Sequence, residues 1–321
     1  MIESKSGAGG SLERLRRSFR TAVVMAIAAT VPSCALLSTD YLPIGALVSV
    51  GDRSDPVRLF VQESGEGSPL LLIHGFGTST NTWRKILPHL ARRHRVIALD
   101  LKGFGQSDKP LDRRYSAFDQ ANLLIDFIKR RNLHDLTIVG HSFGGAVALA
   151  LTLELNDTEP NRVQRLVLID SPAYRQDLPI LFRYLRTPLV ADLGVLVTPP
   201  EVQAKTALMA AYAEQSPIER QDVLAYARPL YEPGGRHALL QTAAQILPAE
   251  LAMLEARYET IRQSTLLIWC RSDDFVPLWV GQRLNNDLPN SRLKVVDGCG
   301  HAPQEERPNR TLKIIKKFLG G

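Results

Sequence analysis

Val139-Gly140-His141-Ser142-Phe143-Gly144-Gly145 is the stretch from which the architecture of the whole chain can be predicted. The residues before it, 136–139, are apolar and mostly β-branched, as in a buried strand, whereas residues 145–151 are rich in Ala and Leu, as in a helix. Glycines two positions before and after Ser142 leave room where a strand and a helix approach each other. This is the G-x-S-x-G pattern between a strand and a helix, which places a serine hydroxyl on a sharp turn.

Apolar strands alternate with helices on both sides of this turn. Segments 46–50 and 57–62 are separated by a turn-rich segment and predict an opening antiparallel hairpin. The later strands are separated by helices, which predicts an α/β fold with a mostly parallel central sheet flanked by helices. The expected later strands are 70–73, 95–99, 136–139, 163–169, 265–269 and 292–296, and the expected helices include 83–92, 118–131, 278–287 and 309–319.

The alternation of strands and helices stops between residues 173 and 263. This segment contains helical stretches rich in Leu and Ala that are interrupted by prolines, and it has too many apolar residues to stay solvated. We therefore expect a helical cap at 173–263, inserted into a sheet domain formed by 46–172 and 264–321.

Residues 1–40 have the composition of a signal or membrane-anchor segment. Four arginines between positions 14 and 20 precede the uncharged run 21–37, which is the layout of an export signal. Arg16-Arg17 partly matches a twin-arginine signal, and Cys34 follows a partial lipoprotein cleavage pattern. We expect an exported or envelope-associated protein that associates with the membrane through this segment. A cytoplasmic enzyme with an additional helix is the alternative.

Composition excludes other classes of function. The 321 residues are 45% hydrophobic and 22% charged, as in an ordinary globular protein, and the net charge of +6 is spread along the chain. Nucleic-acid binding is therefore not expected. The three cysteines, Cys34, Cys270 and Cys299, have no metal-site spacing, so we expect neither a metal nor another cofactor. The sequence does not predict the oligomeric state.

Two polar residues that follow later strands are candidates for the base and the acid that Ser142 needs. A serine hydroxyl is a poor nucleophile at neutral pH and needs a base beside it, with a third group to orient that base. Asp273 follows the predicted strand 265–269, and His301 follows the strand 292–296. The sequence therefore contains candidates for a nucleophile, an acid and a base, in the order Ser142, Asp273, His301.

From about Ala46 onward, four motifs in this order resemble the α/β-hydrolase family with a helical cap. The first three are His74-Gly75-Phe76-Gly77, the D-x-x-G-x-G-x-S-x-x-P loop at 100–110 and the G-x-S-x-G stretch, which corresponds to the family's nucleophile elbow. The fourth is Gly300-His301-Ala302-Pro303, followed by Glu306 and Pro308.

The resemblance implies a role for each site residue. Ser142 would be the nucleophile, and His301 the general base and then the acid. Asp273 would orient His301, and the backbone N–H groups of Phe76 and Phe143 would form the oxyanion hole.

Several polar residues compete for these roles. Asp274 is adjacent to Asp273, but the family spacing of four residues from the acid to a proline, here Pro277, favours Asp273. Asp170, which ends the strand after the elbow, is the reserve position for the acid. His74 and His141 are expected to form structural hydrogen bonds.

The resemblance also places Cys270 and Cys299 at the ends of neighbouring strands. Two buried free thiols are the favoured expectation, with a disulfide as the alternative.

The residue at the elbow narrows the reaction. Haloalkane dehalogenases and epoxide hydrolases of this fold attack with an aspartate, whereas this chain has Ser142. We expect a serine hydrolase that forms an acyl-enzyme. The cap is rich in Leu, Ala and Val, so the expected substrate is a carboxylic ester with an apolar acyl part.

Three alternatives remain open. A hydrolase that cleaves a C–C bond in a ring-fission product would use the same triad, although the elbow of such enzymes tends to read S-M-G-G. The family also contains cofactor-free perhydrolases. A non-catalytic ligand receptor is the least expected, because the triad is intact.

Overall fold

The computed structural model of the protein describes residues 45–213, 215–247 and 251–320. The predicted signal or anchor at 1–40 lies outside these ranges. Within them, no helix is both long enough and apolar enough to cross a bilayer.

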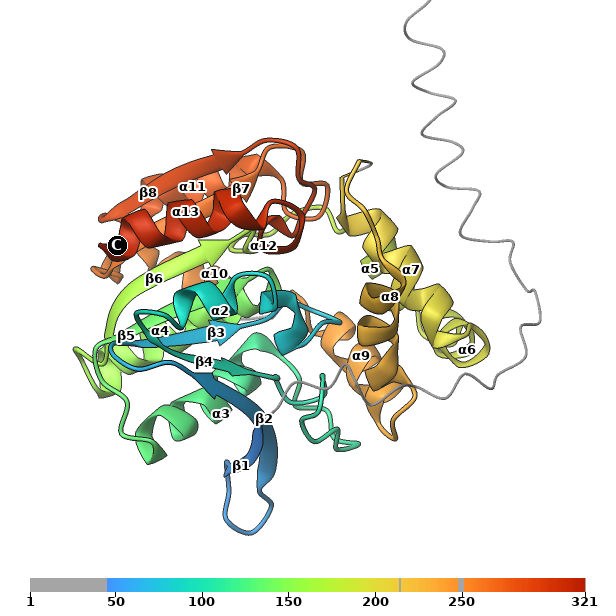
Figure 1. Ribbon diagram of the computed structural model, residues 1–321. Coiled ribbons are helices and arrows are strands. Elements are labelled where there is room, and N and C mark those ends of the chain that lie inside the picture. Colours follow the sequence, from blue (N-terminus) through green and yellow to red (C-terminus); the bar gives the residue numbers. More distant parts are fainter. Residues whose placement is uncertain (1–44, 214, 248–250, 321) are drawn as a thin grey trace, which may run out of the picture. The chain divides into compact units, whose positions relative to one another are not determined.

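An eight-stranded sheet in the order β1-β2-β4-β3-β5-β6-β7-β8 forms the centre of the molecule (Figure 1). The first strand pairs antiparallel with the second, the second pairs antiparallel with β4, and the remaining pairs are parallel. The predicted α/β fold with a mostly parallel sheet is therefore confirmed. The strands are β1 (Ala46–Val50), β2 (Val57–Ser64), β3 (Pro69–Ile73), β4 (Arg95–Leu99), β5 (Leu136–His141), β6 (Val163–Ile169), β7 (Ser264–Cys270) and β8 (Ser291–Val296).

Helices cover both faces of the sheet, which explains why its central strands are apolar throughout. In β3, Leu71 and Ile73 belong to one buried cluster, whereas Leu70 and Leu72 belong to another on the opposite face. Side chains alternate along a strand, so both faces of β3 need a hydrophobic cover. The first face carries α3 (Ala117–Arg130), α4 (Phe143–Thr158) and α11 (Leu278–Asp287), and the second carries α2 (Leu87–Leu90) and α13 (Pro308–Leu319).

The single helix predicted at 83–92 is wrong. The chain forms a 3-10 turn, η2 (Thr80–Trp83), and then the short α2, which has Pro88 in its first turn. Proline lacks an N–H group and disfavours a helical conformation at the preceding residue. A helix that starts at residue 83 therefore cannot run through Pro88 without losing hydrogen bonds.

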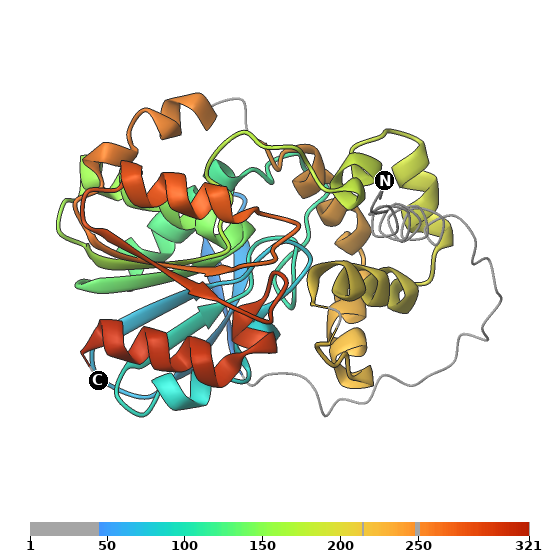
Figure 2. The ribbon, with the colours of Figure 1, turned by 90° about the horizontal axis from the view of Figure 1, so that it is seen from above.

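The described residues between 173 and 263 form helices and turns, with no strand among them. The helices are α5 (Ile180–Leu185), α6 (Val190–Val197), α7 (Pro200–Ala211), α8 (Arg220–Ala227), α9 (Gly235–Ala244) and α10 (Leu251–Glu255), with 3-10 turns η3 (Arg228–Leu230) and η4 (Tyr258–Thr260). In Figures 1 and 2, α5 to α9 form a group beside the sheet domain. The exact boundaries of a cap at 173 and 263 stay a prediction.

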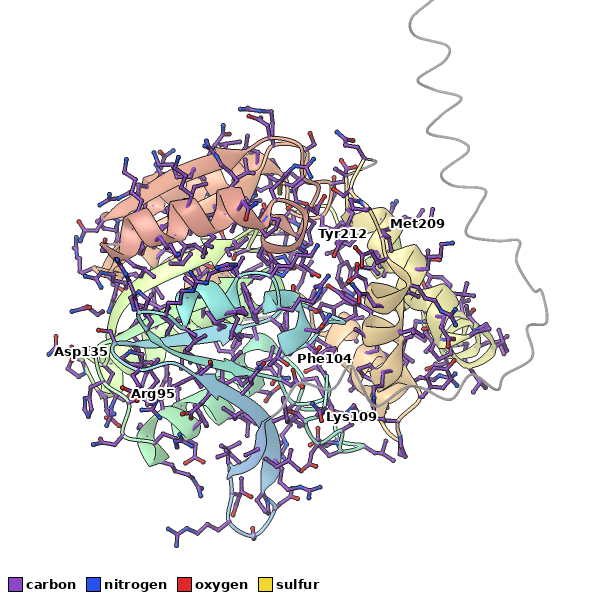
Figure 3. All side chains as sticks on the ribbon, in the orientation of Figure 1. Arg95, Phe104, Lys109, Asp135, Met209 and Tyr212 are labelled. Atoms are coloured by element: carbon purple, nitrogen blue, oxygen red, sulfur yellow. A yellow bond between two sulfur atoms is a disulfide. The ribbon has the colours of Figure 1, made fainter. Side chains whose placement is uncertain are left out.

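The cap helices lie over loops that follow the carboxyl ends of strands. A Cβ atom added to Gly77, after β3, would lie 3.8 Å from Leu239 of α9, and one added to Gly300, after β8, would lie 2.3 Å from the carbonyl oxygen of Ala211. Lys109, which is labelled in Figure 3, lies in the loop after β4 and donates to Glu232 at 2.7 Å. These loops therefore lie between the carboxyl edge of the sheet and the cap.

Candidate active site

Ser142 lies on the turn between β5 and α4, in a backbone conformation that few side chains adopt (φ 51°, ψ −125°). Its amide donates to Ile169 of β6 at 2.9 Å. A Cβ atom on Gly140 would lie 2.5 Å from the carbonyl oxygen of Gly144, and one on Gly144 would lie 2.3 Å from that of Ile73. Only glycine fits these two positions, which confirms the strand–turn–helix arrangement predicted from the sequence.

The structure brings Ser142, His301 and Asp273 together. The imidazole Nε2 of His301 lies 2.8 Å from Ser142 Oγ, and its Nδ1 lies 2.7 Å from Asp273 Oδ2. A carboxylate only accepts hydrogen bonds, so Nδ1 carries the proton and Nε2 accepts from the serine hydroxyl. Asp273 and His301 are buried, whereas Ser142 is half-buried and keeps an accessible surface.

Asp273 is fixed by its own loop. Its Oδ1 accepts from the backbone N–H groups of Phe275 at 2.7 Å and Val276 at 3.0 Å, so both carboxylate oxygens have donors. The neighbouring Asp274 is exposed. Asp273, and not Asp274, is the residue that contacts His301.

The two predicted oxyanion donors belong to segments that meet at Ser142. The amide of Phe143 is the first of α4, where N–H groups have no acceptor within the helix. The loop that contains Phe76 packs against the serine, since a Cβ atom on Gly75 would lie 3.0 Å from Ser142 Cβ. These positions suit an anion formed next to Ser142 Oγ.

His74 and His141 form structural hydrogen bonds, as expected. His74 Nδ1 donates to the carbonyl of Gly75 at 2.8 Å, and its Nε2 accepts from the amide of Leu101 at 2.9 Å. His141 Nε2 donates to the backbone carbonyl of His301 at 2.8 Å. Burial lowers the pKa of His74 to about 4 and, together with the neighbouring imidazole of His301, lowers the pKa of His141 to about 3. Both rings are therefore neutral at pH 7.

A row of aromatic side chains packs against the candidate base. The ring of Phe275 stacks on that of His301 with centroids 5.1 Å apart, and Phe182 of α5 lies 4.9 Å from Phe76 and 6.2 Å from Phe275. Phe182 did not emerge from the sequence, because the direction of a cap helix cannot be read from spacing. Phe275 lies in the loop after β7, and spacing does not show the direction of its ring either. Through Phe275, the three phenylalanines place an apolar surface against the imidazole of His301.

Glu306 holds the loop of the candidate base. Its carboxylate accepts from three consecutive amides, those of Gly300, His301 and Ala302, at 3.0, 3.2 and 3.0 Å. It also accepts from two groups of the cap, the amide of Ala213 at 2.8 Å and the hydroxyl of Ser216 at 2.7 Å. The sequence showed Glu306 only as part of a motif and did not predict its contacts with the cap.

The expectation of two free thiols at Cys270 and Cys299 is wrong, because the two residues form a disulfide with their Cα atoms 5.4 Å apart. Cys270 is the last residue of β7, and Cys299 follows β8, the neighbouring parallel strand. The bond joins the strand end before Asp273 to the loop before His301.

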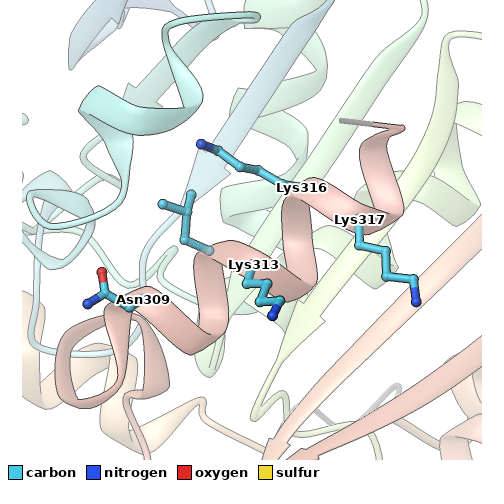
Figure 4. A pocket seen from close by; sticks show the side chains of 5 residues that line it. Asn309, Lys313, Lys316 and Lys317 are labelled. Atoms are coloured by element: carbon cyan, nitrogen blue, oxygen red, sulfur yellow. The ribbon is translucent and has the colours of Figure 1, made fainter.

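A hollow elsewhere on the surface contains none of the candidate residues. It lies on α13, and Figure 4 shows its lining of Asn309, Leu312, Lys313, Lys316 and Lys317.

The sheet order, the serine on its strained turn and the aspartate and histidine after later strands together define a hydrolase of the α/β class. The chain belongs to the alpha/beta hydrolase fold family, whose profile matches residues 68–308. This confirms the resemblance found in the sequence.

Two relatives and one solved structure illustrate the similarity. A protein of Mycobacterium tuberculosis described as uncharacterised is 31% identical over 80% of this chain and 76% of its own length. The 2-hydroxymuconate semialdehyde hydrolase of Pseudomonas sp. (strain CF600) is 30% identical over 82% of this chain and 90% of its own length. A mutant of the meta-cleavage product hydrolase CumD from Pseudomonas fluorescens IP01 has a TM-score of 0.70 and 25% identity, and the match covers 85% of this chain and 97% of that one.

Proposed function

We propose that the protein is a serine hydrolase that transfers an acyl group to Ser142 and then to water. The observation that carries this proposal is the continuous chain of hydrogen bonds from Ser142 Oγ through His301 to Asp273, at 2.8 and 2.7 Å. His301 Nε2 takes the proton of the serine hydroxyl as Oγ attacks the acyl carbon, and Asp273 stabilises the imidazolium that forms.

The same groups complete the reaction. The backbone N–H groups of Phe76 and Phe143 donate to the oxyanion, and each donor contributes roughly a hundred- to thousandfold in rate. His301 then gives its proton to the leaving group. In the second half, His301 Nε2 takes a proton from water as the water oxygen attacks the acyl-enzyme, and His301 then gives this proton to Ser142 Oγ as the acyl–oxygen bond breaks.

A carboxylic ester with an apolar acyl part is the substrate class that we favour. Phe275 stacks on His301, and Phe182 packs against both Phe275 and Phe76, so these rings favour an apolar group beside the reacting carbon. Leu239 of α9 lies next to Gly77 in the oxyanion loop and extends this apolar surface.

Cleavage of a C–C bond in a ring-fission product is the second candidate. It is favoured by the names of the Pseudomonas relative and of CumD. Such a reaction would use the same serine, base and acid, and would differ in the leaving group, which is a carbon atom instead of an oxygen.

The proposed chemistry is tested by covalent labelling. A fluorophosphonate should label the wild type at Ser142, and Ser142→Ala should lose the label and at least about 10⁴-fold in kcat. Ser272→Ala, which changes an exposed serine beside Asp273, is the matched control and should be labelled like the wild type. A label on another residue would refute the assignment.

The substrate class is tested by two sets of compounds. p-Nitrophenyl esters of increasing acyl length should be hydrolysed, with kcat/KM rising as apolar length increases. Turnover of 2-hydroxymuconate semialdehyde without any ester hydrolysis would establish the C–C reaction in place of the ester reaction. Both activities must disappear in Ser142→Ala.

A further inference from the structure

Asp170 is a buried carboxyl group behind the triad that the proposed mechanism does not use. It follows β6, its side chain is fully buried, and its backbone has a positive φ of 44°, which is unfavourable for aspartate. Its Oδ1 accepts from the amide of Cys270 at 2.8 Å, whereas its Oδ2 is buried without a hydrogen-bond partner. A buried carboxylate oxygen without a donor is costly, so Oδ2 needs a proton or a neighbouring donor.

The neighbours of Asp170 are the acid and the base of the candidate triad. One carboxylate oxygen of Asp170, one of Asp273 and one ring nitrogen of His301 all lie within 4.8 Å of one another. Two ionised carboxylates at this distance, away from water, repel each other strongly, so the pair holds a single negative charge.

Hydrogen bonding decides which of the two carries the charge. Asp273 accepts from two backbone amides and from His301, whereas Asp170 accepts from one amide only. Each donor stabilises the charged form, so the negative charge lies on Asp273. Burial, the charge of Asp273 and the charge of Glu306 raise the pKa of Asp170 well above its usual range. Asp170 is thus the carboxyl group of the pair that keeps its proton.

We propose that Asp170 is a positioning residue that stays neutral beside Asp273 and takes over the negative charge when Asp273 is lost. This inference rests on the proposed function, because it gives Asp170 a role only through His301. The oxygen of Asp170 is already close enough to the imidazole to stabilise its charged form after a small shift.

A double-mutant cycle tests the proposal. Asparagine resembles a neutral carboxylic acid in shape and in hydrogen bonding, so Asp170→Asn should keep kcat/KM within about threefold of the wild type. Asp273→Asn should lose most of the activity. Its residual activity should increase as the pH rises and Asp170 ionises. Asp170→Asn/Asp273→Asn should fall at least about tenfold below the product of the two single effects. Asp274→Asn, at the exposed neighbour, is the matched control and should change nothing.

Two results would overturn the role of Asp170. One is a loss of more than about a hundredfold in Asp170→Asn with its fold intact by circular dichroism, which would show that the charge resides on Asp170. The other is an additive cycle, with residual activity in Asp273→Asn that does not depend on pH.

Protein stability provides a measurement that needs no substrate. The pKa of Asp170 is raised in the folded state, so the folded chain holds a proton there that the unfolded chain has lost above about pH 4, and stability falls as the pH rises. Asp170→Asn removes this cost, so the Tm of this variant should rise relative to that of the wild type as the pH increases above about 4. A Tm difference that stays constant would refute the neutral carboxyl. If Ser142 also resists fluorophosphonate, a rising Tm difference shows that only the proposed function has failed.

Discussion

His141 directly precedes Ser142 in the chain, but its ring forms a hydrogen bond with the backbone of His301. Its Nε2 donates to the carbonyl of His301, and its ring meets the edge of Trp83 with centroids 6.5 Å apart. A protonated His141 would be a buried positive charge next to the imidazole of His301, which is why its pKa is lowered to about 3. The neutral ring therefore supports His301 without competing for the proton of Ser142.

The buried neutral ring makes stability depend on pH. Between about pH 6.5 and pH 3 the unfolded chain binds a proton at His141 that the folded chain excludes, so the free energy of unfolding falls as the pH falls. His141→Gln keeps a donor for the His301 carbonyl but does not titrate. We expect the wild type to lose stability faster than this variant, by about 1.4 kcal/mol per pH unit between pH 6 and pH 4.

Urea unfolding at three pH values measures this difference. His134→Gln, at an exposed histidine, is the control and should follow the wild type. Parallel curves for the wild type and His141→Gln would show that His141 is not held neutral.

At the scale of strands and loops, β7 and β8 present the acid and the base. The two strands are parallel neighbours, and the disulfide between Cys270 and Cys299 joins their carboxyl ends, three residues before Asp273 and two before His301. A covalent link at this point limits the relative movement of the two loops. The disulfide therefore helps to keep Asp273 and His301 within hydrogen-bonding distance of each other.

Removing the disulfide should lower both stability and activity. The cysteines are 29 residues apart, a loop length for which loss of the bond costs about 3–4 kcal/mol. Cys270→Ala/Cys299→Ala should therefore melt at a lower temperature, and its kcat should fall about three- to tenfold while KM changes less. Peptide mapping of the non-reduced wild type provides the control. Recovery of both cysteines as alkylated free thiols would contradict the bond.

Most of the strands, and the site residues that follow them, were predictable from the sequence for a physical reason. Strands buried on both faces are continuous apolar runs, such as 70–73, and the polar residues that follow them share one edge of a parallel sheet. That rule located Ser142 and Asp273, whereas His301 follows β8, an edge strand with alternating burial. It failed at residues 83–92, where Pro88 breaks the helix, and at the cysteine pair, because proximity alone does not determine whether two thiols are oxidised.

At the scale of the whole molecule, buried polar groups connect the cap to the sheet domain. Glu305 accepts from Thr82 at 2.6 Å and from Tyr226 of α8 at 2.5 Å, and Arg84 pairs with both Glu305 and Asp222 of α8. Glu306 extends these contacts to 213–216 and to the loop of His301. The partners are far apart in the chain, so no local pattern could predict them. As a result, the position of the cap and the position of His301 depend on the same pair of glutamates.

This arrangement predicts that the two sets of bonds to Glu306 can be separated by mutation. Ser216→Ala removes one bond to the cap and leaves the three amides of the histidine loop bound, so it should cost about 1 kcal/mol in stability and change KM more than kcat. Glu306→Gln places an amide group with only one acceptor oxygen opposite four N–H groups and the Ser216 hydroxyl. It should therefore lower kcat about 10- to 100-fold as His301 loses its alignment with Ser142. Steady-state kinetics together with the rate of fluorophosphonate labelling distinguish the two effects, because labelling reports the attack of Ser142 Oγ and does not require hydrolysis of an acyl-enzyme. If Glu306→Gln folded and labelled at the wild-type rate, the carboxylate would hold the cap only, and His301 would be positioned by Asp273 and the carbonyl contact from His141 alone.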